Sequence, residues 1–223
     1  MSSVWQWFVA GGAVMVPLAG CAIATIALAV ERGRFWWRLA QEQPLLIREA
    51  LVLYGREPDT DRTLRLLRSA PEDWPIVQIF LAALTLDRPT PEEFRLALDS
   101  AAQAQLPQLK RFGTAFDTIV GIAPLLGLLG TVLGLMGSFA ALRWDSIGST
   151  GGPNGAGIGS GLSEALVSTA TGLVVAIGAL LVANVFRSLY RRQVAAIAQH
   201  CGQLELLYRH HWETNGGVPF DLS

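Results

Sequence analysis

The chain has 223 residues, of which 51% are hydrophobic and only 16% are charged, and its mean hydropathy is +0.38. This composition argues against an ordinary soluble domain, and the net charge of −1 argues against a basic surface for nucleic acid. A chain this apolar is expected to place much of its length in lipid.

Three stretches of the sequence lack any Asp, Glu, Lys or Arg: residues 1–30, 118–142 and 165–186. Each exceeds the roughly 20 residues that a helix needs to cross a bilayer. No basic residue precedes the first stretch, and its apolar run is too long for the core of a signal peptide. The sequence therefore predicts three transmembrane helices.

Arginine and lysine are distributed unevenly around these spans. None precedes the first span, 12 lie between the first and second, only Arg143 lies between the second and third, and 4 follow the third. The positive-inside rule then places the N-terminus and the loop around Arg143 outside the cytoplasm. Cys21 lies in a span and Cys201 in the reducing cytoplasm, so no disulfide is expected.

The first span, about residues 8–30, opens with Gly11 and Gly12 and is rich in Ala, Ile and Leu. Aromatic residues flank both of its ends, as is typical of the two membrane interfaces. This composition predicts an outer helix that faces lipid.

Residues 38–112 combine short helical patterns with turn signals. Helices are predicted over residues 45–54 and 61–70. A third is predicted to follow Asp73, which would cap it, with Pro75 in its first turn.

The motif Thr90-Pro91-Glu92-Glu93 is a specific helix start, because it joins a capping box to a proline at the first helical position. The helical pattern continues from there into the second span. Pro107 either kinks this long helix or interrupts it.

The second span contains the segment GIAPLLGLLGTVLGLMGSF, residues 121–139, which is apolar but rich in glycine. At 100° per residue, a stripe of four side chains recurs every seventh position within about 60°: Asp117, Pro124, Thr131 and Ser138. Glycines on the same span suit close packing against another helix: Gly127, Gly130 and Gly134. A helix that only anchored the protein would need neither the hydroxyls nor the glycines.

The segment 143–162 is dominated by Gly and Ser and is predicted to be a flexible loop. The third span then carries a ribbon of small residues within about 80° on a helical wheel: Ala165, Thr169, Gly172, Ala176, Ala179 and Ala183. Glu164 lies at the edge of this ribbon. Beyond the span, apolar residues from Tyr190 to Tyr208 alternate at spacings of 4 and 3. That pattern predicts a tail helix packed in a bundle or against copies of itself.

The membrane region offers little chemistry for an enzyme. It contains no His and no Lys, and its only acids are Asp117 and Glu164. The pair His210-His211 does not form part of a metal-ligand pattern and is predicted to lie on the surface. We therefore expect no catalytic constellation, no metal site and no cofactor.

Two interpretations stay open for the polar residues of the spans. Thr131 and Thr169 serve either close helix packing or a path for protons, and Pro124 and Ser138 would line the same path. Threonine does not ionise near neutral pH, so it cannot itself carry a proton. One chain has too few helices to enclose a path, so several copies are expected to assemble.

The two acids are also open to two interpretations. Glu164 is either part of a proton path or a first-turn acid stabilised by the helix dipole. Asp117 is either a polar residue at the cytoplasmic end of the path or a solvated or paired side chain. If protons move here, the carrier is Glu164 or a carboxylate of a partner.

Residues 121–139 and the segment LSEALVSTATGLVVAIGALLVANVF, residues 162–186, resemble the MotA/TolQ/ExbB proton-channel family, specifically its ExbB and TolQ branch. A weaker likeness over residues 11–37 favours ExbB. The resemblance covers all three spans.

The resemblance implies an all-α protein of the bacterial inner membrane that assembles as a pentameric ring, with its N-terminus in the periplasm and its C-terminus in the cytoplasm. Spans two and three would line a pore that holds a single-span ExbD- or TolR-like partner, and proton flow would drive a TonB- or TolA-like transducer. The motif match assigns Thr131 and Thr169 to the pore lining and Glu164 to its mouth. The partner's membrane aspartate would be the main proton carrier. The alternatives are a TolQ-like role in envelope integrity and division, and a scaffold that holds a partner helix without conducting protons.

The predicted segments are a first span with an interfacial anchor (1–37), a cytoplasmic helical segment (38–112), the second span (113–142), a periplasmic loop (143–162), the third span (163–187) and a cytoplasmic C-terminal helix and tail (188–223). Spans two and three would thus extend into a cytoplasmic helical bundle.

Overall fold

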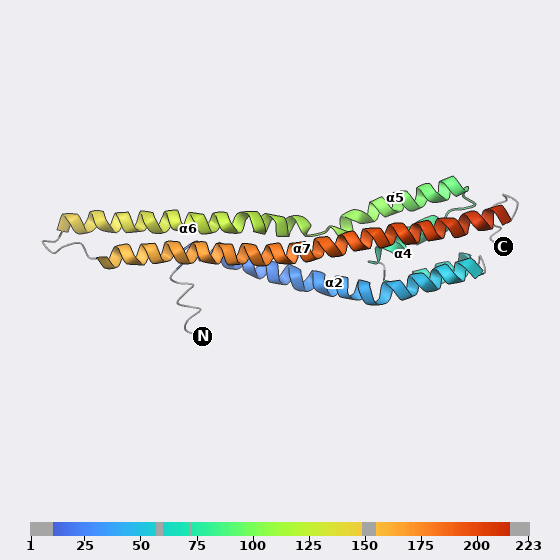
Figure 1. The fold of residues 1–223 in the computed structure, drawn as a ribbon, viewed down its shortest axis with the longest axis horizontal. Helices are drawn as coiled ribbons and strands as arrows, with labels where there is room; N and C mark the ends of the chain where they lie inside the picture. Colours follow the sequence, from blue (N-terminus) through green and yellow to red (C-terminus); the bar gives the residue numbers. More distant parts are fainter. Residues whose placement is uncertain (1–10, 57–59, 72, 149–154, 215–223) are drawn as a thin grey trace. The chain divides into compact units, whose positions relative to one another are not determined.

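The computed structural model of this chain describes residues 11–56, 60–71, 73–148 and 155–214, without the side chains of 141–148 and 155–158. Its helices (Figure 1) are α2 (Met15–Arg56), α3 (Thr60–Arg68), α4 (Pro75–Leu84), α5 (Pro91–Leu109), α6 (Gly113–Gly148) and α7 (Gly155–Thr214). Within the described residues, three helical stretches are long and apolar enough to cross a membrane: Met15–Arg56, Pro91–Ala140 and Gly159–Thr214. The predicted number of spans is confirmed. The start of the predicted first span, residues 8–10, lies outside the described residues.

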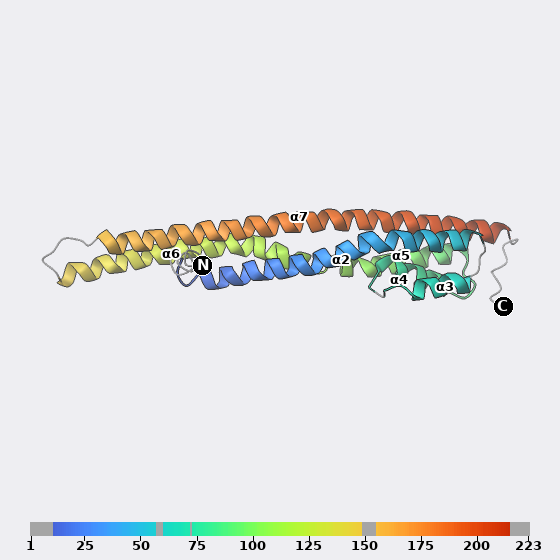
Figure 2. The same ribbon diagram turned by 90° about the horizontal axis from the view of Figure 1, so that it is seen from below.

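Contacts divide the chain into two units. Unit one comprises Met1–Glu31 and Phe112–Phe186, and unit two comprises Arg32–Arg111 and Arg187–Ser223. In unit one, α6 and α7 run side by side in opposite directions, as both views show (Figures 1 and 2). This antiparallel pair carries the residues that the sequence singled out.

Unit two is held together by large apolar side chains from four helices. Tyr54 of α2, Phe80 of α4, Phe94 of α5 and Leu204 of α7 are each at most 2% exposed. The ring of Tyr208 stacks on that of Phe94, with centroids 4.1 Å apart and 8° between the planes. The apolar pattern of the tail helix is therefore buried within this unit at Leu204 and Tyr208.

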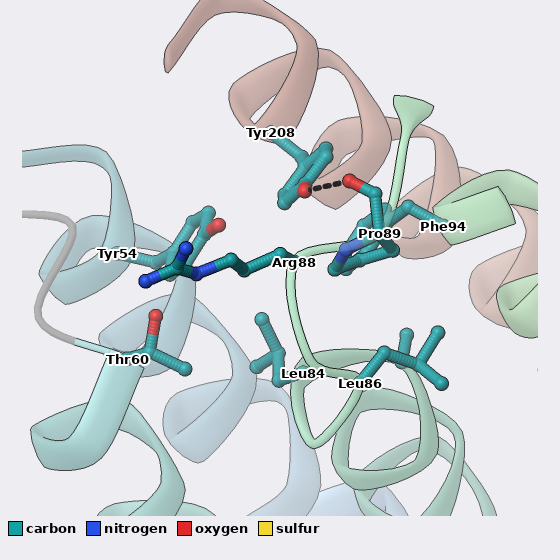
Figure 3. Close-up of a pocket in the computed structure, with 9 residues that line it drawn as sticks. Tyr54, Thr60, Leu84, Leu86, Arg88, Pro89, Phe94 and Tyr208 are labelled. Carbon is teal, nitrogen blue, oxygen red and sulfur yellow. Dashed lines mark hydrogen bonds between the residues drawn. The ribbon is translucent and has the colours of Figure 1, made fainter. Parts of the chain in front are cut away.

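A small cavity lies beside this aromatic stack (Figure 3). The Tyr208 hydroxyl donates a hydrogen bond to the Pro89 carbonyl oxygen at its edge. Burial, and to a smaller extent the neighbouring Tyr208, raises the pKa of Tyr54 far above its usual range. With a volume of about 30 Å³ the cavity has room for water but for no larger ligand.

Helix α2 continues without a break through Pro44 to Arg56. The prediction of a separate helix over residues 45–54 is therefore wrong in its start. A proline inside a helix removes one backbone hydrogen bond. Packing overrides that local cost, because Gln43 and Ile47 on either side of Pro44 are buried at 3% and 1% exposure.

The start of α4 also differs from the prediction. Pro75 is its first residue, but the N-cap is Trp74, and no side chain caps the helix. Asp73 therefore does not have its predicted role. Trp74 is 5% exposed, so the burial of its ring fixes where the helix begins.

The predicted capping box at the start of α5 is confirmed. The Thr90 hydroxyl accepts a hydrogen bond from the Glu93 backbone N–H at 3.3 Å, and Glu93 Oε2 accepts one from the Thr90 N–H at 2.7 Å. The hydrogen bond from the Thr90 backbone N–H, and to a smaller extent the hydrogen bond from the Thr90 hydroxyl, lowers the pKa of the Glu93 carboxyl group.

Replacing Glu93 with glutamine is expected to remove a pH-dependent part of the stability. Because the folded-state pKa is lowered, the ionised carboxylate stabilises α5 fully above the ordinary glutamate pKa of 4.5 and loses this effect as the pH falls through the folded value. The stability difference between wild type and Glu93→Gln, measured by thermal unfolding in detergent, should thus shrink toward acid pH. The matched control is Glu49→Gln at an exposed position of α2. A stability difference between wild type and Glu93→Gln that stays unchanged across the acid range would contradict the expectation.

The long helix predicted from Thr90 into the second span is interrupted. Pro107 lies inside α5, which ends at Leu109, and α6 begins only at Gly113. The break is at Phe112, whose φ of 64° is left-handed. The buried guanidinium of Arg32 lies at this end of α5 and donates from Nη2 to the carbonyl oxygens of Arg111 at 2.6 Å and Gln108 at 3.4 Å. A charged side chain therefore satisfies backbone acceptors that the helix end leaves free.

The predicted flexible loop over residues 143–162 is shorter than expected. Helix α6 continues to Gly148 and α7 begins at Gly155, while residues 149–154 lie outside the described residues. Each glycine in a helix interior lowers helix stability by about 1 kcal/mol relative to alanine. The extension of a helix that has already formed can tolerate this loss.

Both cysteines, Cys21 and Cys201, are free. Burial, with a smaller contribution from Asp99, raises the pKa of Cys201 to about 12. The Cys201 thiol therefore stays protonated near neutral pH and acts as a packing residue.

Candidate functional site

The backbones of α6 and α7 approach each other at glycine. A Cβ placed on Gly172 of α7 would stand 2.7 Å from the Ala123 carbonyl oxygen and 3.0 Å from Gly127 Cα. A Cβ on Gly127 would be 3.1 Å from Ser168 O and from Thr169 Cα. Since these neighbours are backbone atoms, no side-chain rotation could make room.

The same contact continues toward the later part of α6. A Cβ on Gly134 would stand 2.6 Å from the Gly161 carbonyl oxygen, and one on Gly130 would overlap the Ser168 hydroxyl. On α7, most residues of the predicted ribbon are buried: Ala165, Gly172, Ala176, Ala179 and Ala183. The glycines of α6 and the ribbon of α7 thus form one contact in which the helices touch through backbone and methyl groups.

Thr169 joins this contact through its hydroxyl. Its Oγ1 donates to the Gly127 carbonyl oxygen of α6 at 3.1 Å. The threonine side chain is half-buried. Hence Thr169 both ties the two helices together and keeps part of its surface open.

Ser168 is also a member of the contact, although the predicted ribbon did not include it. It is fully buried, and its Oγ lies 2.9 Å from the Ala165 carbonyl oxygen and 3.4 Å from that of Gly127. Small residues at Ala165, Ser168 and Gly172 follow the 3-and-4 spacing of a packing helix, which could have pointed to Ser168 from the sequence.

The predicted polar stripe of α6 does not stay together. Ser138 is buried, and its hydroxyl donates to the Gly134 carbonyl oxygen at 3.1 Å. Thr131 and Pro124 are half-buried, while Asp117 is exposed. The Thr131 hydroxyl donates within its own helix, to the carbonyl oxygen of Leu128 at 2.7 Å. Ser138 therefore belongs to the helix contact, whereas Thr131 lies beside it on an open flank.

Large apolar side chains are exposed along α6 and along the part of α7 before residue 187. Examples are Leu125 and Met136 of α6, at 64% and 62% exposed, and Val174 and Leu181 of α7, at 69% and 62%. Faces of this kind are stable only against lipid or against other helices.

The start of α2 packs against this pair. Val14, Met15 and Leu18 form one buried cluster with Ala123 of α6 and Ala176 of α7. In its first turns the first span thus buries one face against α6 and α7 and leaves Val16 65% exposed, which is compatible with the predicted outer helix. Its later part agrees with the prediction, since three large side chains point outward there: Ile23, Ile26 and Val30, at 68%, 65% and 57% exposed.

Glu164 of α7 lies next to the start of α2 as well. It is half-buried, and its carboxylate lies against Gly12. Thr169 is also on α7, and Thr131 is on the neighbouring α6. The predicted site residues thus share unit one and span two of its helices.

The histidine pair differs from its prediction. His210 is exposed, but His211 is half-buried, and its ring lies 5.6 Å from that of Tyr54. Burial and the neighbouring His210 lower the pKa of His211, against a hydrogen bond with the Gly55 backbone. Among the residues that the structure describes, no group of three His, Cys, Asp or Glu side chains could hold a metal ion.

Comparison with known proteins identifies relatives of this chain. Residues 72–199 match the family model of the MotA/TolQ/ExbB proton channel family. The chain is 53% identical to the putative biopolymer transport protein ExbB-like 3 of Synechocystis sp., over 90% of this chain and 92% of the relative. It is 39% identical to ExbB-like 1 of the same organism, over 92% of this chain and 79% of the relative. The biopolymer transport protein ExbB of Salmonella typhimurium is 37% identical over 45% of this chain and 39% of the relative.

Proposed function

This chain belongs to the MotA/TolQ/ExbB proton channel family, and we propose that it is the ExbB-like subunit of an inner-membrane motor driven by the proton motive force. In this proposal it energises a TonB-like envelope transducer and thereby supports uptake across the outer membrane. The relatives at 53% and 39% identity carry ExbB-like names, which favours this role over a TolQ-like one.

The observation that carries the proposal is the pair of hydroxyls on adjoining helices. Thr131 on α6 and Thr169 on α7 are both half-buried beside a backbone contact that leaves little freedom to move. Glu164 lies on the same helix as Thr169 and would stand at the mouth of the path, with Pro124 along it. Hydroxyls can donate and accept hydrogen bonds and so guide a proton, but they do not ionise.

A second chain is needed to complete such a path. We propose that several copies, five by the family pattern, form a ring that holds a single-span ExbD- or TolR-like partner. Supporting this, the exposed apolar faces of α6 and α7 leave ample surface for other helices. An aspartate in the partner's span would be the main proton carrier. The N-terminus would lie in the periplasm and the C-terminus in the cytoplasm.

Removing both hydroxyls tests the path. The double variant Thr131→Val, Thr169→Val keeps the side-chain shape but removes both donors. We expect it to assemble normally, because Thr131 bonds only within its helix and an interhelical hydrogen bond in a membrane contributes only about 0.6 kcal/mol. Partner-dependent energy transduction should be lost.

The matched control is Thr118→Val, because the hydroxyl of Thr118 also bonds within α6 but is exposed. It should behave like wild type. If the double variant transduces energy normally, the assignment of these threonines to the path is wrong. If the output of the wild-type system survives collapse of the proton gradient, the chain is a scaffold rather than a channel subunit.

A further inference from the structure

Gly12 stands just before α2 in a conformation that other residues rarely adopt. Its φ is +68°, in the left-handed region that favours glycine. Its carbonyl oxygen accepts a hydrogen bond from the Met15 N–H at 3.1 Å, which opens the first turn of α2. The backbone of Gly12 is thus fixed where the helix begins.

The space where a side chain of Gly12 would stand is filled by Glu164. A Cβ on Gly12 would be 2.6 Å from Glu164 Cδ and 3.2 Å from Cγ, and closer still to Oε1. Gly11 differs, because the three atoms nearest to a Cβ there all belong to the flexible side chain of Met15. Of these two glycines, Gly12 is the one whose missing side chain makes room for a carboxylate.

The place beside Gly12 is held firmly. The residues that follow it, Val14, Met15 and Leu18, are at most 8% exposed and pack on α6 and α7. A glutamate side chain has several rotatable bonds and otherwise samples many rotamers. Proton transfer, in contrast, requires a donor and acceptor within hydrogen-bond reach.

We propose that Gly12 is a positioning residue for Glu164, whose carboxylate it allows to lie against the start of α2 at a fixed point of the proton path. The proposal rests on the role given to Glu164 under the proposed function. Of the proposed proton-path residues, Gly12 contacts Glu164, and it acts only through the Glu164 side chain.

A double-mutant cycle tests this coupling in vesicles that hold the chain and its single-span partner. Gly12→Ala should lower the rate of proton uptake about tenfold or more, because a non-glycine residue at this φ is strained and its methyl group displaces the carboxylate. Glu164→Asp shortens the side chain, so the double variant Gly12→Ala, Glu164→Asp should recover much of the rate relative to Glu164→Asp alone. A purely structural role of Gly12 predicts equal losses in both backgrounds, and that result would overturn the proposal.

The matched control is Gly20→Ala, where a Cβ meets no atom within 4 Å. It should leave proton uptake unchanged. Glu164→Gln distinguishes the role of Glu164 in the path from the positioning role of Gly12. If Glu164→Gln conducts normally, the role of Glu164 in the path fails. If it is inactive while Gly12→Ala conducts normally, the positioning role alone fails.

A disulfide test covers the case in which Gly12→Ala reduces the amount of protein in the membrane or Glu164→Asp is itself inactive. In a chain without Cys21 and Cys201, the pair Gly12→Cys, Glu164→Cys should cross-link on mild oxidation, since a Cβ on Gly12 would stand 3.2 Å from Glu164 Cγ, the atom bonded to Glu164 Cβ. The pair Gly20→Cys, Glu164→Cys should not. Absence of the first cross-link would overturn the proposal.

Discussion

Gly172→Val is expected to prevent α6 and α7 from packing and to abolish assembly and proton uptake. A Cβ at this position would lie 2.7 Å from the carbonyl oxygen of Ala123, and valine adds two further methyl groups. Overpacking a tight contact typically costs about 1–3 kcal/mol, and a contact between backbones has no side chain that can move aside. The loss should appear as dissociation of the detergent-solubilised complex on size-exclusion chromatography.

Gly178→Val is the control for this substitution. It lies on the same helix, less than two turns away, but a Cβ there meets no atom within 4 Å. Both variants carry the same change in helix propensity, so their difference reports the helix contact alone. A Gly172→Val protein that assembles and conducts like Gly178→Val would show that α6 and α7 do not touch here.

Arg32→Ala is expected to open the C-terminal end of α5. The Arg32 side chain is 6% exposed and donates to the carbonyl oxygens of Gln108 and Arg111. Hydrogen bonds to a charged group contribute about 1.5–3 kcal/mol, and their loss leaves two carbonyl oxygens at the helix end without this donor. Unit two should therefore unfold at a lower temperature in detergent, and Lys110 and Arg111 should become sites of rapid trypsin cleavage.

The control for this experiment is Arg34→Ala, because Arg34 is two residues away on α2 but exposed. It should show the trypsin cleavage rate and unfolding temperature of wild type. Equal cleavage rates for Arg32→Ala and Arg34→Ala at residues 110–111 would contradict the assigned role of Arg32.

Local signals in the sequence predicted several elements well. The capping box at Thr90 specifies a helix start through adjacent backbone and side-chain atoms, so it needs no information from distant residues. The charge-free stretches predicted three spans because the thickness of a bilayer sets their length. The motifs around Thr131 and Thr169 pointed to the family that the comparisons show.

Features that depend on distant contacts could not be predicted in the same way. The continuation of α2 through Pro44 depends on the burial of Gln43 and Ile47 within unit two. The division of the α6 stripe, with Ser138 in the helix contact and Thr131 beside it, depends on which face of α6 packs against α7. The proximity of Gly12 and Glu164 joins residues that are far apart in the sequence.

The most direct test of the account is proton uptake by vesicles under an imposed membrane potential. Vesicles that hold both this chain and the proposed single-span partner should take up protons, whereas vesicles with either protein alone should not. Uptake should be lost in the double variant Thr131→Val, Thr169→Val and kept in Thr118→Val. Uptake that is absent from vesicles holding both proteins, while the same pair drives its envelope process in cells treated with a protonophore, would contradict a proton-channel role.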